Sequence, residues 1–154
     1  GAMHLVLAVI AGREGDRAAA RQRITTARRI AKRLKRDRND YNTEFGPTNV
    51  ELHAVAVAVD LGDAGEALEL AADIDARKLS PERQARFLVD VGRAHTQRRH
   101  VGEATAALLE AEKLAPEHVR GHHQPREAIN DLLHIAERRA SEDLLGLARR
   151  AGVA

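Results

Sequence analysis

The sequence predicts an all-α fold, a right-handed superhelix of stacked antiparallel helix pairs, with about three pairs followed by C-terminal capping helices. Apolar residues recur at helical spacing along most of the 154 residues. Small residues, mainly alanine and glycine, recur where two such helices would cross. Aromatic residues form only 2% of the chain, so the core has to be built from Ala, Leu, Val and Ile, which suits closely packed helices.

The clearest helix pair lies between Leu88 and Pro116. Small side chains at Gly92, Ala104 and Ala111 allow two backbones to approach, and Pro116 ends the second helix because it lacks an N–H group. The spacing matches the tetratricopeptide repeat, a helix–turn–helix unit of ~34 residues. The residues at the positions of this pattern are Leu88, Val91, Gly92, His95, Ala104, Leu108, Ala111 and Pro116.

An earlier pair is expected between Leu5 and about Arg36. A short apolar helix covers Leu5–Ala11, a turn covers Gly12–Asp16, and a long helix covers Ala18–Leu34 with one apolar face. The opposite face of the long helix is basic, and we interpret it as a solvated surface. A contact with DNA phosphates or with another subunit is the alternative. The basic residues are Arg17, Arg21, Arg28, Lys32, Lys35 and Arg36.

A loop rich in Asn and Asp interrupts the helical pattern from Asp37 to Pro47. It contains Tyr41 and Phe45, two of the three aromatic residues of the chain. Long loops in compact domains are uncommon and often functional. We expect the two aromatic rings to pack the loop onto the helices, with stacking against a ligand as the alternative.

The middle pair is expected to begin at a capping box, in which the Thr48 hydroxyl and the Glu51 carboxylate satisfy amides of the first turn. Its first helix extends to about Leu61, Gly62 and Asp63 form the turn, and the second helix covers Ala67–Ile74.

In the last pair, Ser80 is the expected N-cap of a helix whose first residue is proline. After Pro116, the chain up to Gln124 is expected to be irregular or to form a single helical turn. The other expected helices are Pro81–Gln97, Val101–Leu114, Pro125–Arg139 and a short one that begins at Ser141 and ends before Gly152. The last two would cap the stack, because terminal repeats need a distinct outer face.

Composition excludes several classes of function. The net charge of +2 is too small to indicate nucleic-acid binding, and the absence of cysteine excludes disulfides and thiolate chemistry, so a reducing cytoplasm is expected. No apolar run reaches the ~18 residues of a membrane span. Residues 1–3, Gly-Ala-Met, resemble the remnant of a cleaved expression tag. Residues 4–154 are then expected to be one regulatory domain of a longer protein.

Catalysis is not indicated by any motif. The sequence has no glycine-rich phosphate loop, no serine or cysteine nucleophile motif and no zinc-binding His-Glu-x-x-His pattern. We therefore expect a protein that is not an enzyme and has neither catalytic residues nor a cofactor. His118 and His122 are four residues apart and His123 is adjacent, but a solvated histidine-rich turn is favoured over a metal site.

Ligand binding is the better hypothesis, because the first helices of stacked pairs line a concave surface. An asparagine there can hold a peptide backbone, and an arginine can bind a carboxylate with two hydrogen bonds. The alternative is that Arg86, Asp90 and Arg93 form a ladder of ion pairs and that Asn49 caps its helix. The polar residues expected on this surface are Asn49, His53, Asp60, Arg86, Asp90, Arg93 and Gln97.

Four segments resemble the C-terminal tetratricopeptide-like regions of actinobacterial helix-turn-helix regulators of the Cro/repressor-like, xenobiotic-response-element class. The most specific is the segment from Asp37 to His53, with the sequence DRNDYNTEFGPTNVELH. The others are Leu79-Ser-Pro-Glu-Arg83, Ala107-Leu-Leu-Glu-Ala-Glu112 and Leu147-Ala-Arg-Arg150. The resemblance extends over most of the chain from Leu5 to Val153.

The resemblance implies a homodimeric domain of a transcription regulator that senses a peptide or a small molecule, and we also expect a partner protein as an alternative ligand. It implies contact with DNA only through a separate N-terminal domain, and no contact with a membrane. No ligand residues are carried over from these regulators. The alternative function is a protein–protein interaction scaffold of the tetratricopeptide type with no role at DNA.

Overall fold

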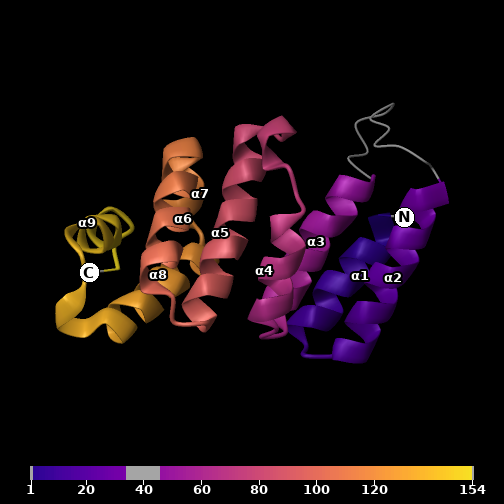
Figure 1. Cartoon of the computed structure of the whole chain (residues 1–154), viewed down its shortest axis with the longest axis horizontal. Coiled ribbons are helices and arrows are strands. Elements are labelled where there is room, and N and C mark those ends of the chain that lie inside the picture. Colours follow the sequence, from indigo (N-terminus) through magenta and orange to yellow (C-terminus); the bar gives the residue numbers. More distant parts are fainter. Residues whose placement is uncertain (1, 34–45, 154) are drawn as a thin grey trace. The chain divides into compact units, whose positions relative to one another are not determined.

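The computed structural model of the protein describes residues 2–33 and 46–153, and within these ranges every regular element is a helix. The expected all-α class is therefore confirmed for this part of the chain. The helices divide into two compact units, Gly1–Ile74 and Asp75–Ala154 (Figure 1). Across the same residues, no helix has the length and the apolar character that crossing a bilayer requires.

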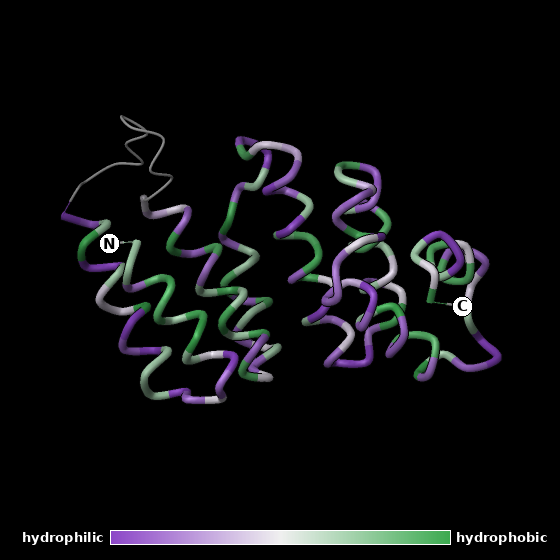
Figure 2. Tube along the Cα trace, turned by 180° about the vertical axis from the view of Figure 1, so that it is seen from behind, coloured by the Kyte–Doolittle hydropathy of each residue, from purple (hydrophilic) through white to green (hydrophobic). Residues whose placement is uncertain are grey.

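The first unit is a pair of helical hairpins. α1 packs against α2, α3 packs against α4, and α3 also contacts both helices of the first hairpin. Buried side chains of Leu5, Ile24 and Val50 meet in its core, where most other contacts come from alanine. Figure 2 shows how hydrophobic and hydrophilic residues alternate along these helices. The helices are α1 (Ala2–Arg13), α2 (Arg17–Arg33), α3 (Pro47–Asp60) and α4 (Ala64–Ala72).

Both hairpin turns use the same Gly-Asp pair. Gly15 and Gly62 adopt φ values of 75° and 81°, in the left-handed region that favours glycine. Gly12, which was expected in the first turn, instead lies inside α1. A Cβ atom at Gly12 would lie 3.3 Å from a methyl group of Val57, so this glycine allows α1 and α3 to approach closely.

The expected capping box at Thr48 and Glu51 is wrong. α3 begins at Pro47, two residues earlier than a Thr48 cap requires, and its N-cap is Gly46, which has no side chain to accept a hydrogen bond. Proline at the first helical position needs no N–H partner, so it starts the helix in place of Thr48. Glu51 then pairs with Arg28 of α2.

The second unit is built on one long hairpin. α5 packs along α6, α8 covers both of them, and α9 contacts α6 and α8. Its core contains the buried residues Leu108, Ile129, Leu132, Leu144 and Leu147. The elements are η1 (Ala76–Lys78), α5 (Pro81–Gln97), α6 (Val101–Leu114), α7 (Pro116–Gly121), α8 (His123–Ala136), η2 (Glu137–Arg139) and α9 (Glu142–Arg150).

The helix bounds of this unit agree closely with those expected from the sequence. α5 and α6 coincide with the expected ranges, and the Ser80 hydroxyl caps α5 by accepting from the amide of Arg83. Ser141 caps α9 in the same way. α8 begins two residues before Pro125, because proline is tolerated in the first turn of a helix.

The crossing of α5 and α6 depends on Gly92. A Cβ atom built there would lie 3.0 Å from Cγ and 3.1 Å from Cδ2 of Leu108, which is fully buried. Leu108 therefore fills the space that any other residue at position 92 would occupy. The small residues of the repeat pattern thus mark the closest approach of these two backbones.

We predict that Gly92→Val destabilises the protein by at least about 1 kcal/mol, because overpacking of a closed core costs about 1–3 kcal/mol and outweighs the small gain in helix propensity over glycine. Urea unfolding monitored by circular dichroism measures this loss. Gly102→Val is the matched control, because a Cβ atom at this helical glycine meets nothing within 4 Å. Equal stability of the two variants would contradict the close packing at Gly92.

Candidate ligand-binding groove

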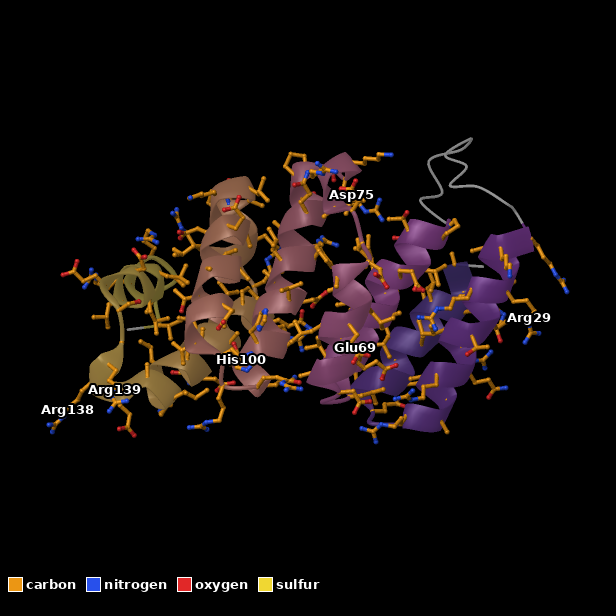
Figure 3. All side chains as sticks on the ribbon, in the orientation of Figure 1. Arg29, Glu69, Asp75, His100, Arg138 and Arg139 are labelled. Carbon is orange, nitrogen blue, oxygen red and sulfur yellow. The ribbon has the colours of Figure 1, made fainter. Side chains whose placement is uncertain are left out.

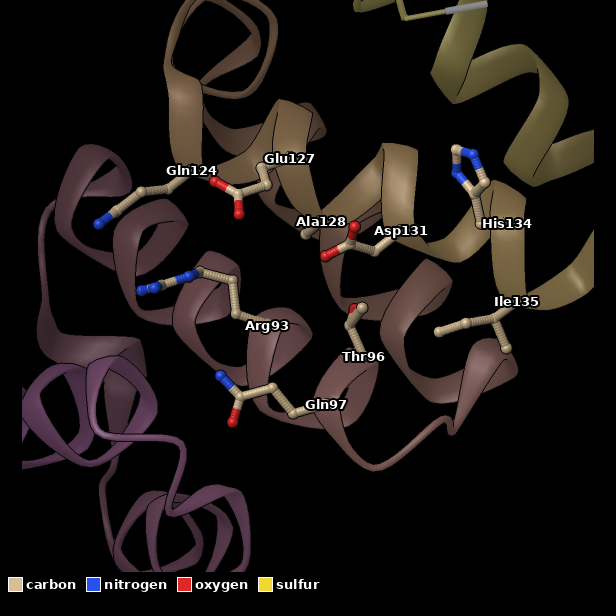
Figure 4. A pocket seen from close by; sticks show the side chains of 9 residues that line it. All are labelled: Arg93, Thr96, Gln97, Gln124, Glu127, Ala128, Asp131, His134 and Ile135. Atoms are coloured by element: carbon tan, nitrogen blue, oxygen red, sulfur yellow. The ribbon is translucent and has the colours of Figure 1, made fainter.

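A groove of about 320 Å³ lies between α5 and α8 of the second unit (Figure 4). Its walls are polar, and two small side chains that are buried, Thr96 and Ala128, lie between them. The volume is at the lower end of the range found for ligand pockets. The lining residues are Arg93, Thr96 and Gln97 from α5, with Gln124, Glu127, Ala128, Asp131, His134 and Ile135 from α8.

Helical spacing explains why these side chains share one groove. On α8 the lining residues recur three or four positions apart, so they form a stripe along one face of the helix. The opposite face of α8 carries Ile129 and Leu132, which are fully buried in the core. Core packing therefore fixes the rotation of α8 and turns its polar stripe toward α5.

Arg93 is the most deeply placed charged side chain of the groove. Its Nη1 donates to Oδ1 of Asp90 over 3.1 Å, and each of the two side chains is only 17% exposed. Figure 4 shows the Arg93 side chain extending along α5 toward Gln124. The ion pair holds the guanidinium in place and compensates its charge.

The α8 wall presents mostly hydrogen-bond acceptors. Glu127 is 2.8 Å from Nε2 of His123. Nδ1 of His134 lies 2.8 Å from the carbonyl oxygen of Asn130. Because a carbonyl oxygen only accepts, Nδ1 of His134 is the donor in this contact.

Of the ligand residues expected on α5, Arg93 and Gln97 line the groove, and Asp90 adjoins it through its ion pair with Arg93. Arg86 does not line it. Its Nη2 pairs with Glu82 over 3.0 Å at an exposed position. The alternative, a ladder of ion pairs through Arg86, Asp90 and Arg93, therefore holds only for the pair of Asp90 and Arg93. Arg86 pairs instead with Glu82, one helical turn earlier.

The other expected ligand residues lie elsewhere. Asn49, His53 and Asp60 belong to α3 of the first unit, and Nδ1 of His53 donates to the carbonyl oxygen of Asn49 over 2.9 Å. Tyr41 and Phe45 lie outside the described residues.

Sequence reasoning missed the whole α8 wall of the groove. The signal was present as polar residues at positions 124, 127, 131 and 134, which share a helix face. The sequence pattern of the last helices is typical of a cap, whose polar face is expected to meet only solvent.

The basic face of α2 is largely engaged by acidic residues. Arg17 donates to both carboxylate oxygens of Asp63 and to the carbonyl oxygen of Leu61. Hydrogen bonds from Arg17 outweigh desolvation and place the pKa of Asp63 below its usual value. Arg21 pairs with Glu66 at 2.8 Å.

Arg28 on the same face pairs with Glu51 at 2.6 Å. Arg29, by contrast, is exposed and points away from the helices of its unit (Figure 3). Arginines of α2 thus pair with acidic residues of α3, of α4 and of the turn between those two helices. These ion pairs stabilise the first unit and compensate the charges of these arginines. Lys35 and Arg36 lie outside the described residues.

Glu112 is the most buried carboxylate of the second unit, with a side chain that is 9% exposed. Arg150 of α9 binds both of its oxygens at 2.8 to 3.1 Å, and Arg120 of α7 adds a hydrogen bond of 3.1 Å. Burial alone would raise the pKa of Glu112, but the hydrogen bonds from Arg150 and Arg120 together place it below the usual value. Glu112 therefore joins α6, α7 and α9 and is not among the residues that line the α5–α8 groove.

We predict that Glu112→Gln destabilises the protein by about 1.5–3 kcal/mol, since a hydrogen bond to a charged group contributes on that order. Glu110→Gln, on an exposed position of the same helix, is the control and should change stability by less than about 0.5 kcal/mol. Chemical unfolding at neutral pH measures both. A neutral effect of Glu112→Gln would show that this cluster does not stabilise the unit.

The loss of stability in Glu112→Gln should also depend on pH. Because the folded-state pKa of Glu112 is lowered, its stabilisation is complete above the ordinary value of 4.5 and is lost as the pH falls through the folded-state value. The stability difference between the wild type and Glu112→Gln should therefore shrink in acid. Unfolding curves between pH 7 and about pH 3 measure this change.

The histidines near the start of α8 form a compact pair. The ring centroids of His118 and His122 are 4.3 Å apart, and His122 is the residue between α7 and α8. Burial lowers the pKa of His118, and the adjacent His122 ring lowers it further. Within the described ranges, no group of three or more His, Asp or Glu residues is arranged to hold a metal ion.

Compared with known proteins, the chain matches no family, no curated protein and no solved structure. The geometry of the groove therefore carries the functional argument.

Proposed function

We propose that this chain is the regulatory domain of a DNA-binding transcription regulator, built on tetratricopeptide-like helix pairs, and that its α5–α8 groove binds a peptide, a small molecule or a segment of a partner protein. The observation that carries the proposal is the groove itself. It places polar side chains of two helices around a shared space, in the way that ligand sites between packed helices are built.

The tetratricopeptide-like assignment is supported by the two hairpins of the first unit and the α5–α6 hairpin of the second. Gly92 and Ala104 lie at the crossing of α5 and α6, as the repeat pattern requires. The link to a DNA-binding domain is supported by the sequence resemblance of the segment from Asp37 to His53. The preceding coding sequence of the gene tests that link directly, and a helix-turn-helix encoded there is expected.

In the proposed mechanism, ligand binding changes how the helices of the second unit pack, and this change alters the spacing of two attached DNA-binding domains. α8 is well placed for such a role because one of its faces lines the groove while the other contributes to the core. A ligand that contacts both walls would favour one separation of α5 and α8 over others.

We predict that Asp131→Trp blocks the groove, because the indole would occupy its space from an exposed position that the core does not need. Native mass spectrometry of the chain, mixed with a low-molecular-mass extract of its source organism, should show a retained mass for the wild type. The variant should bind at least about tenfold more weakly, which is 1.4 kcal/mol.

Glu110→Trp, on the outer face of α6, is the matched control and should retain the ligand. The bound state should also have a raised melting temperature, because a ligand that binds only the folded state stabilises it. If the wild type retains no mass and its melting temperature is unchanged, the proposal of a sensory groove fails and a protein-docking scaffold becomes the better function.

Dimerisation is the second part of the proposed function, and an apolar stripe on α1 supports it. Val6 and Ile10 are 54% and 46% exposed and lie four residues apart, so they share one face of the helix. Exposed apolar surface of this kind is typical of contacts between proteins.

We predict that Val6→Glu converts a concentration-dependent dimer into a monomer, because the stripe would then bury an unpaired charge. Sedimentation equilibrium measures the change. Leu145→Glu on α9 replaces another exposed apolar residue and should leave the dimer intact. A wild-type chain that stays monomeric at high micromolar concentration would refute this part of the proposal.

A further inference from the structure

We infer that the α5–α8 groove recognises a positively charged amine, either a primary ammonium or a guanidinium group on an alkyl chain. The inference rests on the proposed function, because it names the chemical class of ligand for the same groove. It follows from the balance of charges around the groove and from the hydrogen-bonding state of each lining group.

The charges of the groove do not cancel. Arg93 is the one arginine or lysine among its lining residues, and the adjacent Asp90 already compensates its guanidinium at 3.1 Å. α8 adds two carboxylates, Glu127 and Asp131. The groove therefore has a surplus of negative charge, although the chain as a whole has a net charge of +2. Attraction of a cation is thus a local property of this groove.

Asp131 is the lining carboxylate whose charge no side chain of the described residues compensates. Within residues 2–33 and 46–153, it has no hydrogen bond or ion pair, whereas Glu127 has the His123 ring at 2.8 Å. Figure 4 shows the Asp131 carboxylate turned into the groove, toward the Thr96 side of α5. A cationic donor placed there would gain a charge-assisted hydrogen bond without breaking an existing one.

The two carboxylates can act on one donor group. Glu127 and Asp131 are four residues apart on α8, so they lie on the same face one helical turn apart. An ammonium has three N–H donors, so one ammonium can donate to both carboxylates at once. The alkyl stem would lie over Ala128, near the apolar side chain of Ile135.

The size of the groove limits the ligand. A volume of about 320 Å³ accommodates one extended side chain or a short amine, and it is too small for a folded surface. Two sources offer the required chemistry, namely a lysine or arginine side chain of a peptide and a free alkyl diamine. The experiment separates them.

The test is an NMR titration of the isotope-labelled chain with four probes. Three are capped alanine tripeptides whose central residue is lysine, glutamine or glutamate, and the fourth is 1,5-diaminopentane. We expect the lysine peptide or the diamine to shift the amide signals of the residues that line the groove. Stronger binding of the lysine peptide identifies a peptide side chain as the ligand, and stronger binding of the diamine identifies a free amine.

Asp131→Asn should weaken cation binding about fivefold, as expected for the loss of one partly exposed charge pair. Glu110→Gln removes the same charge from an exposed position outside the groove and should leave the affinity unchanged. An affinity of Asp131→Asn equal to that of the wild type would overturn the inference.

The remaining outcomes separate this inference from the proposed function. If the glutamine or glutamate peptide shifts the groove signals as strongly as the lysine peptide, the groove binds ligands but does not select a cation, so only the inference is wrong. If none of the four probes shifts these signals at millimolar concentration, the inference is wrong, and the proposed function is still decided by the mass-spectrometry test with Asp131→Trp.

Discussion

Close approach of helices through small side chains is the constraint on which both units depend. With aromatic residues at only 2% of the chain, the cores are filled by alanine, valine, leucine and isoleucine. Small side chains fill space only if the backbones come close, and protein interiors leave few voids. Gly12 against Val57 in the first unit and Gly92 against Leu108 in the second are the glycines at which two different helices approach most closely.

Ion pairs add contacts between helices to those made by the small side chains of the core. In the first unit, Arg17, Arg21 and Arg28 join α2 to α3, α4 and the turn between those two helices. These pairs are partly exposed, so each contributes little by itself. Glu112 differs, because it is nearly buried and both of its arginines come from other helices. Its cluster adds to the buried side chains of Val119, Leu144 and Leu147, which pack α7 and α9 onto the same core.

The groove follows from the same packing. Small residues at Thr96 and Ala128 leave space between α5 and α8, and the core side of α8 fixes which of its polar residues face that space. Arg93 is neutralised within α5, while Asp131 on α8 has no partner in the described chain. The selectivity proposed for the groove is therefore a consequence of how one helix is rotated against another.

The sequence by itself determined the helical class, the bounds of α5 and α6, and the capping role of Ser80. These features depend on local periodicity and on the chemistry of single turns, which are readable along the chain. Arg93 and Gln97 were found for the same reason, because their spacing places them on one face of α5.

Only the tertiary structure decided which partners those residues meet. Glu51 could satisfy its own helix or reach Arg28, and the position of Pro47 and the packing of α2 selected the second choice. For a similar reason, the sequence alone did not determine that α8 forms one wall of the groove. A polar stripe on a helix indicates a face away from the core, and only the packing of Ile129 and Leu132 determines whether that face meets solvent alone or another helix.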